Sequence, residues 1–191
     1  MNPHGALAAS PGVRDNLNRR PRTLCWRETG WFRRLPSQVS TVDFLQELDR
    51  TRDETLRCFG LGERDLARSY GPGKWSVRQI LHHLSDAETV MAERIRRVLS
   101  EGRRVLWAFD QDAWARALDY STMPLELSRE IYRSTRAGIR YLASAHYVKS
   151  GHLEWVHSET GVRTLRDELD KVAAHNEHHL GQIRTALGRA D

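Results

Sequence analysis

Three histidines lie within five positions near the end of the chain: His175, His178 and His179. If this segment is helical, side chains four positions apart share one face, with Cβ atoms about 5–6 Å apart, so His175 and His179 point the same way. Two imidazoles at this spacing can bind one metal ion, for which Zn–N bonds are about 2.0–2.1 Å long. His178 projects about 100° away and is expected at the flank of that face or at the surface.

The face that carries His175 and His179 also carries apolar residues. Val172 lies three positions before the pair and Ile183 four positions after it, so the face is expected to point into the protein. One histidine on such a stripe is usually a hydrogen-bonded core or boundary residue. Two buried neutral imidazoles are costly unless something bridges them, so the pair favours a metal site.

An earlier segment supplies a third candidate ligand. His83 lies three positions after Ile80 and four before Ala87, at the edge of an apolar stripe, whereas His82 is turned further toward Asp86. Three imidazoles from two helices leave coordination positions open. This arrangement is typical of a catalytic or substrate-binding metal, because structural zinc sites are usually closed by four protein ligands.

Two polar residues are placed to support these ligands. Asp86 follows His83 by three positions, and Gln182 follows His179 by three, so each is predicted to orient a ligand through a hydrogen bond or to contact substrate. We expect one divalent transition metal, with Zn or Ni favoured over Fe, Cu or Mn. The order of affinities alone does not choose among these metals.

Four amphipathic helices are predicted to carry these residues. Capping patterns open three of them, at Ser40-x-x-Asp43, Ser76-x-x-Gln79 and Thr164-x-x-Asp167. Pro124 suits the first turn of another helix. Apolar residues then recur with the helical period. The predicted helices cover about residues 41–59, 76–100, 124–145 and 164–187.

The connections between these helices contain weaker signals. The segment Phe109–Ala115 predicts one or two helical turns, and residues 146–163, with two glycines and an alternating stretch, predict an extended loop or a short hairpin. No strong strand signal occurs elsewhere. Four long amphipathic helices therefore predict an all-α fold, a four-helix bundle.

The positive charge is confined to one end of the chain. Residues 1–40 hold seven arginines against two acidic residues, whereas the remaining 151 residues carry 23 basic and 23 acidic side chains. A neutral body argues against a nucleic-acid partner. Residues 1–36, which are rich in Pro, Gly, Asn and Arg, are predicted to be a flexible basic tail, and residues 37–191 the helical metal-binding domain.

Cysteine content and hydropathy bear on the compartment. The chain has two cysteines, too few for a disulfide framework or a thiolate zinc cluster. It has no apolar run of the roughly 18 residues that a membrane span needs, and no signal-peptide pattern. We therefore expect a cytoplasmic protein with no membrane partner.

Two segments resemble a known family. The stretch Gly73–Glu88, GKWSVRQILHHLSDAE, and the stretch His175–Ile183, HNEHHLGQI, resemble the DinB-like metalloprotein family, especially its YfiT-like branch. The resemblance covers about residues 40–188. It implies a four-helix bundle with a long crossover connection, with Phe109–Trp114 of that connection near the pocket. It also implies that His83, His175 and His179 bind the metal.

The resemblance also implies a class of reaction. Characterised relatives include S-transferases and isomerases that use a low-molecular-weight thiol such as bacillithiol or mycothiol. A Lewis-acidic metal lowers the pKa of a bound thiol and presents a thiolate to an electrophile. The expected partners are such a thiol, an electrophilic small molecule and a second copy of the chain in a homodimer. Two alternatives remain open: a metal-dependent hydrolase, and a non-catalytic, stress-related bundle that binds a metal or a small ligand.

Overall fold

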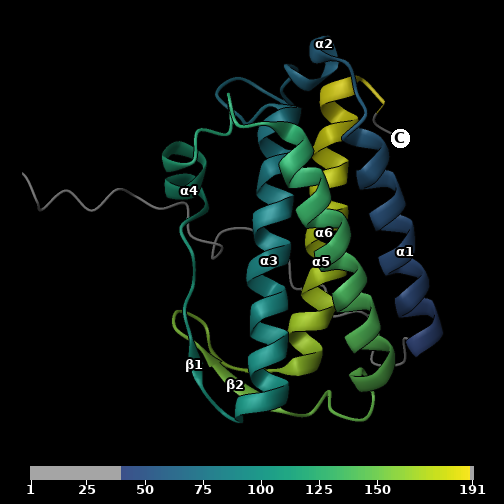
Figure 1. Cartoon of the computed structure of the whole chain (residues 1–191), viewed down its shortest axis with the longest axis vertical. Helices are drawn as coiled ribbons and strands as arrows, with labels where there is room; N and C mark the ends of the chain where they lie inside the picture. Colours follow the sequence, from purple (N-terminus) through teal and green to yellow (C-terminus); the bar gives the residue numbers. More distant parts are fainter. Residues whose placement is uncertain (1–39, 190–191) are drawn as a thin grey trace, which may run out of the picture. The chain divides into compact units, whose positions relative to one another are not determined.

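Four long helices dominate the part of the chain that the computed structural model describes, residues 40–189 (Figure 1). They are α1 (Thr41–Cys58), α3 (Val77–Glu101), α5 (Leu125–His146) and α6 (Leu165–Leu187). Each begins and ends within one residue of its predicted position, so the predicted bundle is confirmed. The predicted basic tail, residues 1–36, lies outside the described residues.

Side chains fix where three of these helices begin. In each case a hydroxyl accepts a hydrogen bond from the backbone N–H three residues later, and in α3 and α6 the later side chain bonds back to the cap. The pairs are those predicted: Ser40 with Asp43, Ser76 with Gln79, and Thr164 with Asp167. Each cap accepts from a backbone N–H group that the first turn leaves without a partner, and it contributes about 1 kcal/mol to stability.

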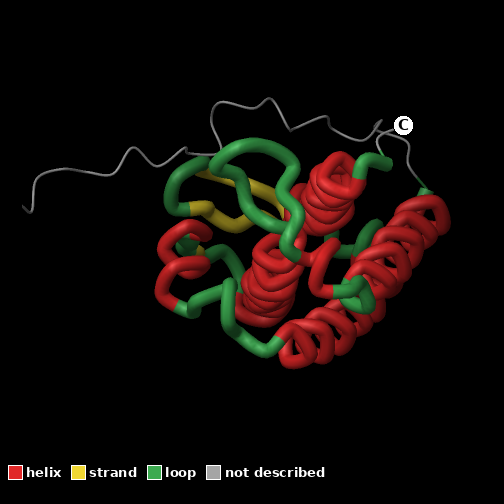
Figure 2. Tube along the Cα trace, turned by 90° about the horizontal axis from the view of Figure 1, so that it is seen from above, coloured by secondary structure: helices red, strands yellow, loops and turns green. Residues whose placement is uncertain are grey.

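The order of the helices around the bundle differs from their order in the chain. Both α1 and α3 pack against α5 and α6, so α1 and α3 face each other across the bundle (Figure 2). In Figure 1, α3 and α5 both run downward and are parallel neighbours. A short turn cannot join parallel helices. The connection of residues 102–124 returns the chain to the start of α5, as the predicted crossover requires.

Short elements lie between the long helices. They are α2 (Glu63–Leu66), β1 (Val105–Leu106), α4 (Gln111–Ala117), β2 (Glu154–His157) and β3 (Gly161–Thr164). The hairpin β2–β3 is antiparallel, and β1 pairs with β2 in parallel, Val105 opposite Val156. The helical turns and the hairpin were predicted, whereas α2 and β1 were not. β1 has two residues and a distant partner, so no local period marks it.

The core has two apolar parts, stacked along α3. One surrounds Met91 and includes Trp155 of the hairpin, and the other surrounds Leu81 near α2. Between them on α3 and α5 lie Glu88 and Arg136, which form a buried ion pair. Within residues 40–189, no helix combines the length and the apolar composition that crossing a bilayer requires.

Candidate metal centre

Three histidines from two antiparallel helices meet inside the bundle. His83 lies near the start of α3, and His175 and His179 lie one turn apart in the middle of α6. The Nε2 atom of His175 is 3.1 Å from Nε2 of His83 and 3.2 Å from Nε2 of His179. All three side chains are buried, with at most 7% of their surface exposed. The structure thus brings together the three histidines that helix phase selected.

The spacing of these nitrogens fits a shared metal ion. With bonds of about 2.0–2.1 Å, two nitrogens on one ion lie roughly 2.8–3.4 Å apart for angles between 90° and 109°. The three donor atoms all lie within 4.8 Å of one another. A neutral imidazole has one N–H, so His175 can donate to at most one of its two neighbours. A cation would instead accept the lone pairs of all three nitrogens.

A hydrogen bond to Gln182 determines which ring nitrogen of His179 carries the proton. Nδ1 of His179 lies 2.8 Å from Oε1 of Gln182, which can only accept, so the proton is on Nδ1 and the lone pair of Nε2 faces the centre. The amide of Gln182 is oriented in turn by His178, whose Nε2 accepts from the amide nitrogen at 2.9 Å. Gln182 therefore takes the position predicted for it. The contribution of His178, expected only at the flank, was missed.

Burial keeps the three imidazoles neutral. It lowers the pKa of His179 to about 3, and it lowers the pKa of His83 and of His175 well below the ordinary value of 6.5. For His83 and His175, the next cause is the charge that His179 would carry. A histidine must be neutral to bind a metal, so these shifts leave the site ready for a cation at neutral pH.

Asp86 does not support a ligand in the way we predicted. Its carboxylate accepts a hydrogen bond from the hydroxyl of Tyr120, in the crossover connection, and burial raises the pKa of Asp86. The prediction rested on the phase of α3 alone, which cannot show that Tyr120 competes for the carboxylate. Contact of Asp86 with substrate stays a prediction. His82 lies outside the cluster, with Nδ1 2.7 Å from the Ser128 hydroxyl.

Aromatic rings flank the centre on the side of His83. The ring of Trp75, just before α3, lies 5.0 Å from that of His83, and Phe109 stacks on His83 at 6.2 Å and 19°. Trp114 packs edge-on against Phe109 at 5.1 Å. The crossover connection therefore lies beside the site, as the resemblance implied. The contact of Trp75 was missed, although the residue lies eight positions before His83.

Asn176 fixes the rotation of α6 about its own axis, a role that we did not predict. It is fully buried, and its side-chain oxygen accepts from the hydroxyls of Thr55 in α1 and Tyr132 in α5, each at 3.2 Å. These bonds hold the far side of α6, so that His175 and His179 face α3. A polar residue inside the HNEHH run was the available signal, but its partners come from distant helices.

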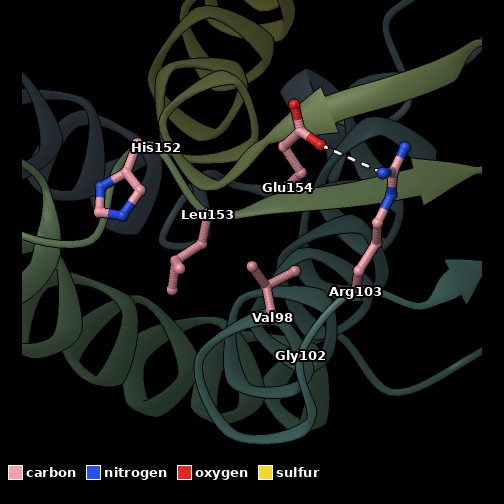
Figure 3. Close-up of a pocket in the computed structure, with 6 residues that line it drawn as sticks. All are labelled: Val98, Gly102, Arg103, His152, Leu153 and Glu154. Carbon is pink, nitrogen blue, oxygen red and sulfur yellow. Dashed lines mark ion pairs between the residues drawn. The ribbon is translucent and has the colours of Figure 1, made fainter.

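A surface pocket at the other end of α3 is separate from this centre. It has a volume of about 320 Å³, and its walls include Val98 and the ion pair between Arg103 and Glu154 (Figure 3). Fifteen residues of helix, roughly 22 Å, separate His83 from Val98. The pocket therefore does not contribute to the three-histidine centre.

Comparison with known proteins places the chain in a family. The family model described as the DinB superfamily matches residues 47–183. A "Putative metal-dependent hydrolase" from Oceanobacillus iheyensis is 28% identical over 157 residues, which cover 80% of this chain and 90% of the relative. A relative of the same name from Halalkalibacterium halodurans is 26% identical over 129 residues, covering 68% of this chain and 75% of the relative.

A solved structure has the same fold. YfiT from Bacillus subtilis, described as "a probable metal-dependent hydrolase with an unusual four-helix bundle topology", aligns with a TM-score of 0.70 and 22% identity. The alignment covers 81% of this chain and 91% of YfiT. With the family match over most of the helical domain, the chain belongs to the DinB superfamily.

Proposed function

We propose that this protein binds one divalent transition metal, Zn or Ni ahead of Fe, Cu or Mn, through Nε2 of His83, His175 and His179. The observation that carries the proposal is the convergence of three buried, neutral imidazoles at 3.1 and 3.2 Å. The relatives named above, described as metal-dependent, support it. Three protein ligands leave positions open for a substrate, so we further propose that the protein is an enzyme.

The first candidate reaction is transfer of a low-molecular-weight thiol to an electrophilic small molecule. When bound, the metal would supply the Lewis acidity that lowers the pKa of a thiol. Three residues would support such a metal site. Gln182 fixes the proton of the ligand His179, and the rings of Trp75 and Phe109 lie against His83. Aromatic walls suit an apolar electrophile and keep bulk water from that side.

The second candidate is hydrolysis of an ester or amide, which the names of the relatives favour. In this chain the residue after His175 is Asn176, so the two ligand histidines of α6 do not form a His-Glu-x-x-His pattern. Metal-dependent hydrolases with two histidines on one helix commonly use a glutamate as general base. This difference supports thiol transfer as the first candidate.

Metal content and turnover of matched variants test the proposal. Protein purified without a polyhistidine tag should contain about one transition metal ion per chain and should conjugate thiols to electrophiles such as 1-chloro-2,4-dinitrobenzene. His179→Ala should lose both the metal and the activity while staying folded. His152→Ala, at an exposed histidine outside the centre, should keep both. Conjugation by metal-free His179→Ala protein would refute the transfer mechanism.

Other outcomes decide between the alternatives. Ester hydrolysis that depends on the metal, without thiol conjugation, would support the hydrolase. Metal binding without either activity across several thiols, electrophiles and esters would support a binding protein. Absence of a transition metal from wild-type protein, with no uptake of Zn or Ni in equilibrium dialysis, would refute the site itself.

A further inference from the structure

The small sheet has an open edge at β1. Its strand order is β1–β2–β3, so among the described residues β1 has a neighbouring strand on one side only, and Figure 1 shows it outside β2. The carbonyls of Arg104 and Leu106 accept hydrogen bonds from N–H groups of β2 and of the residue after it, at 2.8 and 3.0 Å. Backbone groups alternate in direction along a strand, so the N–H and the carbonyl of Val105 point away from β2. An edge of this kind is a template for another strand.

The outward face of the sheet carries an apolar row. Val105 lies opposite Val156 in the parallel pair, and Val156 lies opposite Val162 in the hairpin. Val105 and Val162 leave 58% and 53% of their surface exposed. Trp107, two positions after Val105, leaves 78% exposed, whereas Leu106 between them is buried. Exposed apolar side chains thus lie directly beside the open edge, a combination that marks a surface for association.

The backbone after β1 is held by other parts of the bundle. The carbonyl of Trp107 accepts a hydrogen bond from the buried Arg94 of α3 at 2.5 Å. Phe109, two positions later, stacks on the ring of His83. Since the Trp107 carbonyl already has a donor, the backbone groups of Val105 are the ones left to bind a new strand. A strand added there would adjoin the segment that leads to the metal centre.

The side chains around Val105 are complementary to themselves under two-fold symmetry. In an antiparallel pair centred on Val105, each Val105 N–H would donate to the Val105 carbonyl of the other copy. Residue 103 of one copy then lies opposite residue 107 of the other. Arg103 is exposed and pairs at 3.4 Å with Glu154 on the outward face (Figure 3). Its guanidinium would face the exposed ring of Trp107 in the second copy, a favourable cation–π arrangement that occurs twice in the pair.

We propose that β1 pairs antiparallel with β1 of a second copy of this chain, about a two-fold axis at Val105. The two small sheets would join into one sheet of six strands, and the apolar row would continue across the axis. Val105, Val162 and Trp107 each have at most about 250 Å² of surface and are partly covered, so they offer less than the roughly 800 Å² per partner of a standard interface. We therefore expect a dissociation constant in the micromolar range. The pairing does not depend on the metal.

Sedimentation velocity of the full chain at about 1–200 µM tests the pairing. Wild-type protein should pass from the mass of one chain to twice that mass within this range. Val105→Lys should stay monomeric at every concentration, because two ammonium groups would face each other across the axis. Val148→Lys is the matched control at a valine outside the sheet that leaves 67% of its surface exposed, and it should dimerise like wild type. Circular dichroism should give the same helix content for all three proteins.

An exchange of charge tests the position of the two-fold axis. Val105→Glu should also be monomeric alone, because like charges would again meet. An equimolar mixture of Val105→Lys and Val105→Glu should recover dimers that contain one copy of each, since position 105 faces itself only across the proposed axis. Absence of mixed dimers would overturn the axis at Val105. A wild type that stays monomeric up to about 200 µM, or Val105→Lys protein that dimerises as tightly as wild type, would overturn the pairing of β1.

Discussion

Two of the buried polar groups on α3 lie within a few turns of each other and are completed in different ways. The guanidinium of Arg136 bonds to both carboxylate oxygens of Glu88, and its remaining nitrogen bonds to the Leu48 carbonyl and the Thr51 hydroxyl. Five residues earlier, His83 begins the three-histidine centre, where nitrogens face one another. The ion pair is matched entirely by groups of the chain.

This difference separates a structural role from a functional one. Buried polar groups are tolerated when each finds a partner, and the ion pair meets that condition while joining α1, α3 and α5. The centre has the opposite arrangement, since three neutral imidazoles present their nitrogens to a common point. The first group should therefore control folding, and the second should respond to metal and to protons.

Breaking the ion pair should have the largest effect on stability. Arg136→Met leaves the Glu88 carboxylate buried without its partner, and we expect the free energy of unfolding to fall by about 3–5 kcal/mol. Urea unfolding followed by circular dichroism measures the loss. Arg140→Met is the matched control on the same helix, because Arg140 pairs with Asp49 at the surface and should contribute less than about 1 kcal/mol. Equal losses in the two variants would contradict the structural role of the buried pair.

Acid should destabilise the metal-free protein through the histidines. Burial lowers the pKa of His179 from its ordinary value of 6.5 to about 3 in the folded protein, so the unfolded chain binds the proton first as the pH falls. Stability present above pH 6.5 is lost progressively toward pH 3. Between pH 7 and pH 5 the loss from this residue should be about 2 kcal/mol.

Urea unfolding of metal-free protein at several pH values tests this slope. His179→Gln should reduce the pH dependence of the unfolding free energy by the equivalent of up to one bound proton, because glutamine does not titrate. Excess zinc at neutral pH should stabilise the wild type by about 2.7 kcal/mol at a hundred times the dissociation constant, but not His179→Gln. A slope unchanged by the substitution would show that His179 is not held neutral by burial.

The smallest predicted effect concerns Gln182, which accepts a hydrogen bond from the ligand His179. Gln182→Ala removes the acceptor that fixes the proton of His179 and should weaken zinc affinity about tenfold, with little change in the urea midpoint. Competition with a chromophoric chelator measures the affinity. Gln46→Ala, at an exposed position of α1, provides the control. Unchanged affinity in Gln182→Ala would mean that the ring orientation of His179 is set by packing alone.

Local rules were sufficient to predict the helices and the three central histidines. The caps at Ser76 and Thr164 and the apolar stripes act within one helix, so the sequence defines both the ends and the inward face. The positions of His83, His175 and His179 follow from those faces.

Features that depend on distant segments could not be predicted in this way. β1 exists because Val105 meets Val156, and Asn176 is held by Thr55 and Tyr132 from two other helices. Asp86 had the correct phase on α3 but meets Tyr120, which the sequence places 34 positions later. In each case the partner is chosen by packing between segments, and no spacing within a helix reveals it.

The separation of His83 from His175, 92 positions along the chain, has a consequence for the timing of assembly. His175 and His179 belong to α6, the last of the four long helices to be synthesised, so a growing polypeptide offers only one of the three imidazoles until then. Metal should therefore enter after synthesis of the bundle is nearly complete. An ion held by these residues would then close a long loop, and a link of this length restricts the unfolded chain more than a link between neighbouring helices would.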